Sequence, residues 1–137
     1  MIEFIKDNDS DDEQIIAIIV RGSYNDEGAK FFTPNSFSQQ LGYLSRPKGY
    51  LVKPHIHNLV IREVSYTQEV LVVKSGIIKV NLFNRKKEFI KAVILNPPDL
   101  ILLASGGHGI EFLEASELIE IKQGPYISPQ EDKEIFS

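Results

Sequence analysis

The chain has 137 residues, of which 42% are hydrophobic and 25% are charged, and this is the composition of an ordinary globular domain. Its net charge of −4 argues against a nucleic-acid-binding surface, which needs a basic patch. The chain has no cysteine, which excludes disulfides, thiolate metal ligands and thiol catalysis, so a bound metal would need nitrogen and oxygen ligands.

Short runs of β-branched, aromatic and leucine residues, separated by Gly, Pro, Asn, Asp and Ser, predict an all-β fold. We expect a turn at 7–13, loops at 21–30 and 33–37, and a polar tail from 125 to 137 that lies over the surface. Many short strands at nearly regular spacing are typical of a sandwich or barrel, and no linker or repeat divides the single domain, residues 1–137. In chain order, the expected strands are 2–5, 14–20, 38–44, 50–57, 68–75, 77–83, 89–95, 99–104, 108–113 and 117–122.

Apolar residues at every second position of these strands are expected to line the interior. The basic cluster at 85–87 falls in a hairpin turn and is expected to face solvent. Phe31 and Phe32 would pack an N-terminal segment either onto the barrel or onto a second subunit. The expected interior residues are Leu71, Val73, Val80, Leu82, Ile101, Leu103, Ile110, Phe112, Ile119 and Ile121.

The three histidines of the chain form a candidate metal site. His55 and His57 are two residues apart on an expected strand, so they project to the same face. Glu69 begins the next strand, and His108 follows a Ser-Gly-Gly turn later in the chain. Neutral imidazoles and a carboxylate bind Fe, Mn, Ni, Cu or Zn ions. An isolated His-x-His in a strand also occurs without metal, so incidental histidines are the alternative.

The spacing of these residues resembles the first motif of the cupin superfamily. That motif is Gly, five residues, His-x-His, a short gap, Glu, six residues and Gly. Here Gly49 is followed by five residues and then His55 and His57, and Glu69 is followed by six residues and then Gly76. The gap before Glu69 has eleven residues where the motif has three or four. We expect this insert to form a loop at the barrel mouth.

Two further comparisons with the cupin motifs qualify the resemblance. Glu63 competes with Glu69 for the carboxylate position, because its gap is nearer that of the motif, but it lacks the apolar strand and the glycine that should follow. The second motif is degraded: His108 is in place, whereas Phe112 stands where the motif has asparagine.

The resemblance implies a cupin-type double-stranded β-helix, or jelly-roll barrel, made of two antiparallel sheets over about 45–123. It also implies a homodimer, and the chain is similar to small single-domain bacterial cupins linked to cell-surface carbohydrate pathways. The resemblance further implies a set of four metal ligands, namely His55, His57, Glu69 and His108.

The expected function is that of a metal-dependent enzyme, for example an oxygenase or an isomerase or epimerase, acting on a small polar substrate such as one derived from a sugar. The alternatives are a non-catalytic module that binds a small molecule or sugar, and a structural or partner-binding domain. We expect no nucleic acid, no membrane and a cytoplasmic location, since no apolar run approaches the roughly 18 residues of a membrane span and the N-terminus is acidic. Candidate acid–base residues are Glu63 and Tyr66, and candidate substrate-binding residues are Lys53, Gln39, Arg62 and Gln68. A solvent-facing role is the alternative for Lys53 and for the loop residues Arg62, Glu63, Tyr66 and Gln68, and Gln39 and Gln40 must face opposite ways on their strand.

Overall fold

The computed structural model describes residues 1–7 and 14–137, so the turn expected at 7–13 lies almost wholly outside the described residues. The described chain is all-β apart from one short helix, as the sequence predicts. Its elements are β1 (Ile2–Asp7), β2 (Gln14–Val20), β3 (Gly28–Phe31), β4 (Gly42–Ser45), β5 (Glu69–Ser75), β6 (Ile78–Phe83), β7 (Phe89–Leu95), β8 (Leu100–Leu103), β9 (Gly107–Phe112), β10 (Glu117–Lys122) and α1 (Pro129–Asp132).

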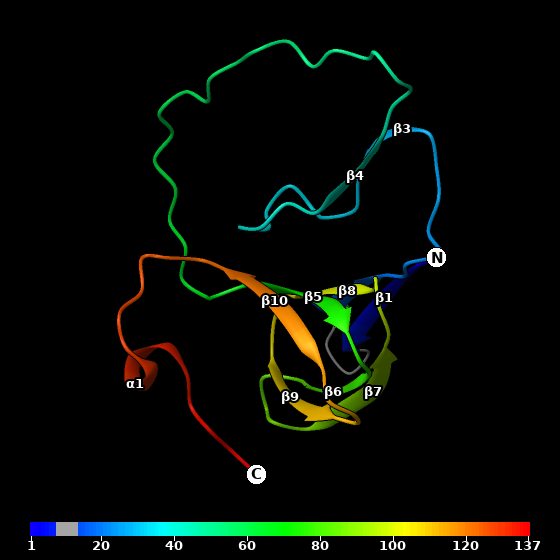
Figure 1. The fold of residues 1–137 in the computed structure, drawn as a ribbon. Coiled ribbons are helices and arrows are strands. Elements are labelled where there is room, and N and C mark those ends of the chain that lie inside the picture. Colours follow the sequence, from blue (N-terminus) through cyan, green and yellow to red (C-terminus); the bar gives the residue numbers. More distant parts are fainter. Residues whose placement is uncertain (8–13) are drawn as a thin grey trace.

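The strands form three antiparallel sheets (Figure 1). A five-stranded sheet has the order β1-β2-β8-β5-β10, and a three-stranded sheet has the order β7-β6-β9. Between them lies the main core, which includes Leu71 and Val73 of β5 and Val80 and Leu82 of β6. The third sheet is the β3–β4 hairpin, whose strands pair only with each other among the described residues.

The two larger sheets form an open sandwich, so the expectation of a closed barrel is wrong for this structure. Within the described chain, β9 pairs only with β6, and β10 pairs only with β5. Residues 113–116 link β9 to β10 and cross from one sheet to the other, so the two unpaired edges lie on the same side of the sandwich. Closure fails there because the expected strand 50–57 is not paired with either edge.

The predicted interior is correct away from this open side. Seven of the ten expected residues, from Leu71 to Ile110 in chain order, are buried or pack against the main core. Phe112, Ile119 and Ile121 are instead 56%, 51% and 51% exposed. Phe112 lies on the inner face of β9, beside this open edge. Ile119 and Ile121 point instead to the outer face of β10, because Leu118 packs against the core and strand alternation turns its neighbours outward.

A second apolar cluster covers the outer face of the five-stranded sheet. Ile18 and Val70 are buried there together with Leu102, and Phe32 and Phe37 pack over them from the connection between β3 and β4. The 32–41 segment is therefore fixed to the sandwich by side-chain packing, although the hairpin that flanks it is not part of either large sheet.

Residues 46–66 form a long extended segment, which we call the excursion, and which contains no strand or helix. Figure 1 shows it arcing away from the sandwich between β4 and β5. The strand expected at 50–57 is therefore wrong for this structure, and the one at 38–44 is reduced to β4. The loop expected at 21–30 instead ends in β3, because Gly28 to Phe31 pairs with β4.

The C-terminal tail lies over the surface, as expected. Asp132 of α1 accepts a 2.9 Å hydrogen bond from Thr67 and lies 3.7 Å from the amine of Lys122. The ring of Phe136 packs edge-on against Phe83 at 5.1 Å. Among the described residues, no helix is long and apolar enough to cross a membrane.

Candidate metal centre and adjoining pocket

Glu69 and His108 meet between the two large sheets. Glu69 begins β5 with the same alternation as the core residues Leu71 and Val73, so its carboxylate points between the sheets. His108 lies on β9 with the same alternation as Ile110, which packs against the core from the opposite sheet. As a result, His108 Nε2 lies 2.7 Å from Glu69 Oε1.

A second carboxylate adjoins this pair. The hydrogen bond with His108 lowers the pKa of Glu69 to about 2, so that this carboxylate is ionised at neutral pH. Glu120 of β10 shares a hydrogen bond with Glu69, and that contact raises the pKa of Glu120. Two carboxyl groups, those of Glu69 and Glu120, therefore lie together at the open side of the sandwich, and their negative charge favours a bound cation.

The other two expected ligands lie elsewhere. His55 and His57 are exposed on the excursion, with ring centroids 5.4 Å apart. His55 Nδ1 lies 2.9 Å from the carbonyl oxygen of Lys53. In the described part of the chain, no three His, Cys, Asp or Glu side chains gather as a metal site. The structure therefore joins the expected ligands in two pairs, Glu69 with His108 and His55 with His57, and does not join the pairs.

The Glu69–His108 pair fits half of a metal coordination sphere. Two donors bound to one ion at roughly 2.0–2.2 Å each, at right angles, lie about 3 Å apart. The observed separation of 2.7 Å is close to that value, so a cation would replace the hydrogen bond with little movement of either side chain. One nitrogen and one oxygen are too few for a tight site, and transition metals would need further donors.

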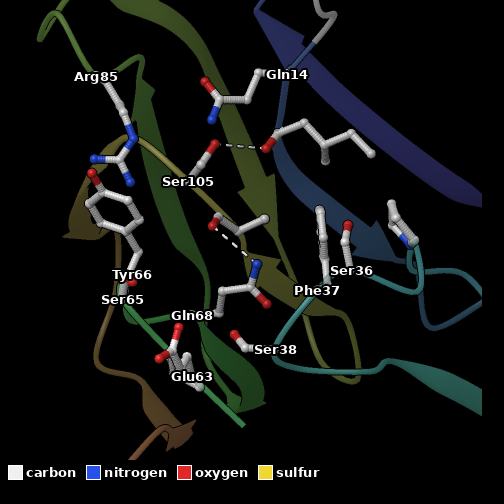
Figure 2. A pocket seen from close by; sticks show the side chains of 14 residues that line it. Gln14, Ser36, Phe37, Ser38, Glu63, Ser65, Tyr66, Gln68, Arg85 and Ser105 are labelled. Carbon is white, nitrogen blue, oxygen red and sulfur yellow. Dashed lines mark hydrogen bonds between the residues drawn. The ribbon is translucent and has the colours of Figure 1, made fainter.

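A pocket of about 450 Å³ lies at one end of the sandwich (Figure 2). It contains three of the residues singled out in the sequence, Glu63, Tyr66 and Gln68, but neither Glu69 nor His108. The remaining residues that line it are Gln14, Ile15, Pro34, Ser36, Phe37, Ser38, Val64, Ser65, Arg85, Ala104 and Ser105.

Gln68 has a structural role on the floor of this pocket. It is buried, its side-chain oxygen accepts a 3.0 Å hydrogen bond from the Gln39 backbone, and its amide donates to the Ala104 carbonyl at 3.3 Å (Figure 2). Its own backbone N–H donates to the Gln123 side chain at 2.7 Å. These bonds fix the point where the excursion rejoins the sandwich.

Arg85 is the pocket residue that the sequence does not identify. Residues 85–87 are exposed in a turn, as expected. The guanidinium of Arg85 nevertheless lies 3.6 Å from the ring centroid of Tyr66, and Figure 2 shows the two side chains next to each other. Position 85 is in a basic turn between β6 and β7, and nothing in the local sequence indicates contact with residue 66. Lys87 of the same turn instead pairs with Glu134 at 2.5 Å.

The remaining candidates are dispersed. Lys53 and Arg62 are exposed on the excursion and do not line the pocket, and Gln39 contacts Gln68 through its backbone. Comparison of the chain with family models, with curated proteins and with solved structures finds no match.

Proposed function

We propose that the chain is a cupin-like, metal-dependent enzyme. It would bind a divalent transition metal and act on a small polar, sugar-like substrate. The observation that carries this proposal is the 2.7 Å approach of His108 and Glu69 from opposite sheets. An imidazole and an ionised carboxylate inside a rigid β scaffold are a ligand pair for Fe, Mn, Ni, Cu or Zn. His55 and His57 would supply the remaining two protein donors.

The metal ion would act as a Lewis acid toward substrate oxygens. A four-ligand site of this kind leaves coordination positions open for water or substrate. Tyr66 and Glu63 would be the acid–base groups, since both line the pocket at the end of the sandwich, where Tyr66 stacks on Arg85.

A non-catalytic binding module is the second candidate, and the pocket favours it. Its volume of about 450 Å³ suits a small molecule, and its walls combine an aromatic ring, a guanidinium and several hydroxyl groups. Arg85 and Tyr66 are already stacked, and this arrangement presents fixed polar groups to a ligand. On this reading the metal anchors the ligand and no bond is broken.

The test begins with metal analysis of protein purified without a polyhistidine tag. We expect bound metal near one ion per chain in the wild type and a loss of most of it in His57→Ala. Asn58→Ala is the matched control, because it changes the neighbouring exposed position without removing a donor. A wild type that takes up no metal would overturn the proposal. Incubation with nucleotide-linked and free sugars, followed by mass spectrometry, separates turnover from binding alone.

A further inference from the structure

The excursion exposes more apolar surface than a water-soluble loop carries. Leu59, Ile61 and Ile56 are 93%, 90% and 88% exposed. Large apolar groups that are exposed contiguously mark a surface that is covered by a partner. The other exposed apolar residues of this segment are Tyr50, Leu51, Val52, Val60, Val64 and Tyr66.

The open side of the sandwich has two strand edges without partners within the described chain. The edges of β9 and β10 present unpaired backbone N–H and C=O groups on the same side, and exposed edges of this kind bind an added strand. Phe112, which shares its face of β9 with the core residue Ile110, is 56% exposed beside this edge. The open side therefore lacks both hydrogen-bond partners and an apolar cover.

The excursion has the properties of the missing strand. It is already extended, it lacks secondary structure of its own, and residues 50–57 are enough to span the six residues of β9. Pro54 within them has no N–H to donate, which an edge strand tolerates. In a strand at that edge, His55 and His57 would project to the same face, and β9 already directs His108 between the sheets.

The chain does not use the excursion to close its own sandwich. The segment is bound at its end by the buried Gln68, and it is followed at once by Glu69, yet its middle runs away from the body (Figure 1). The β3–β4 hairpin before it also pairs with no other strand among the described residues, and an isolated two-stranded hairpin is marginally stable. Both parts therefore lack strand partners elsewhere in the described chain.

We propose that two copies of this chain exchange their excursions, so that the 46–64 segment of each copy pairs with the β9 edge of the other. His55 and His57 of one copy then complete the metal centre begun by Glu69 and His108 of the other. This inference rests on the proposed metal-binding function for its ligand assignment. A two-fold dimer satisfies both copies at once, because the same exchange closes both sandwiches.

The first experiment tests the exchange without metal. Since the chain has no cysteine, the double variant His57→Cys/His108→Cys introduces the only two thiols. Under mild oxidation we expect a covalent dimer of twice the 15.5 kDa chain mass on a non-reducing gel. The two single variants are the controls and should give no such band at the same rate. A disulfide within one chain, or none at all, would overturn the exchange, and so would a monomeric wild type in light scattering.

The second experiment tests whether the metal centre is shared. One chain carries His55→Ala/His57→Ala and the other carries Glu69→Gln/His108→Ala, with two different non-histidine tags. Each alone should lose Co²⁺ binding. Co-expressed and purified through both tags, the mixed dimer should recover one Co²⁺ per two chains, because one of its two sites receives all four ligands. Thermal melts check that each variant is folded.

The outcomes separate the two proposals. Metal binding by the wild type without recovery in the mixed dimer would refute sharing and leave metal binding intact. A covalent dimer from the double cysteine variant, together with a wild type that binds no metal, would support the exchange and refute the proposed function.

Discussion

The guanidinium of Arg85 lies 3.6 Å from the ring centroid of Tyr66, and this contact joins the β6–β7 turn to the segment that leads into β5. The two residues are nineteen positions apart in the chain, and Figure 2 shows them next to each other on one side of the pocket. The stack shapes the pocket wall, and it also fixes the last residues of the excursion against the sandwich.

A double-mutant cycle measures this contact. Arg85→Ala and Tyr66→Ala should each lower the free energy of unfolding, and their coupling should be about 0.5–1 kcal/mol, as expected for a cation–π pair that is partly solvated. Urea denaturation of the four proteins gives the value. Tyr66→Phe serves as the control, since it keeps the ring and should retain most of the coupling. A coupling of zero would show that the stack does not hold the segment.

Acid should remove a specific part of the stability of the metal-free protein. The pKa of Glu69 is lowered to about 2 by its hydrogen bond with His108, so its carboxylate stabilises the folded state above the ordinary value of 4.5. This contribution is at most about 2 kcal/mol, because the carboxylate is only partly buried and solvent screens it, and it is lost as the pH falls from 4.5 toward 2. The free energies of unfolding of the wild type and Glu69→Gln should therefore differ most at neutral pH and become equal near pH 2. A constant difference would contradict the assignment.

Glu120 should behave in the opposite sense. Its pKa is raised by the hydrogen bond with Glu69, so its protonated form favours folding and its charged form at pH 7 opposes it. Glu120→Gln keeps an N–H donor for Glu69 and removes a charge, so it should stabilise the metal-free protein at pH 7 by less than about 1 kcal/mol, because the site is solvated. This increase in the free energy of unfolding should vanish at pH 3. Glu114→Gln, on the exposed turn after β9, is the matched control.

Metal binding should depend on pH through the imidazoles. Histidine ligates only when neutral, so bound metal should be released below about pH 5–6. Chelation at pH 7.5 should lower the Tm by several degrees, because a ligand that binds only the folded state stabilises it. Equilibrium dialysis against Co²⁺ from pH 4 to 8 gives the profile. Full occupancy at pH 4 would count against ligation by histidine.

Two glycines with positive φ should differ sharply in their tolerance of alanine. Gly106 has φ +72°, and a Cβ there would lie 2.1 Å from the Phe83 carbonyl oxygen, so Gly106→Ala should destabilise the fold by about 2–4 kcal/mol. Gly49 has φ +87° with no heavy atom within 4 Å of such a Cβ, so Gly49→Ala should cost at most about 1–2 kcal/mol. Thermal unfolding compares them. Equal effects would mean that conformation alone matters at position 106.

The sequence predicts the eight strands of the two large sheets to within two residues at each end, because their apolar alternation is satisfied by partners in the same chain. The same reasoning fails at 50–57. Its pattern is that of a strand, but a strand forms only where it pairs with an edge, and this segment pairs with neither open edge of its own chain.

Part of the candidate site can likewise be predicted from the sequence, and part of it cannot. Glu69 and His108 meet because strand alternation places both between the sheets, and alternation can be read from sequence. The separation of His55 and His57 from them depends on the path of the excursion, which no local pattern encodes. Arg85 was missed because its contact with Tyr66 depends on how a turn and a connection approach each other in space.

The packing of Phe136 constrains a position far away in the chain. A Cβ at Gly107 would lie 2.7 Å from its ring, directly beside His108 on β9. The size of the side chain at position 107 therefore limits the size of the side chain at position 136, and the reverse also holds. Among homologues, a side chain at the former should coincide with loss or shortening of the aromatic residue at the latter, so the two columns of an alignment should covary.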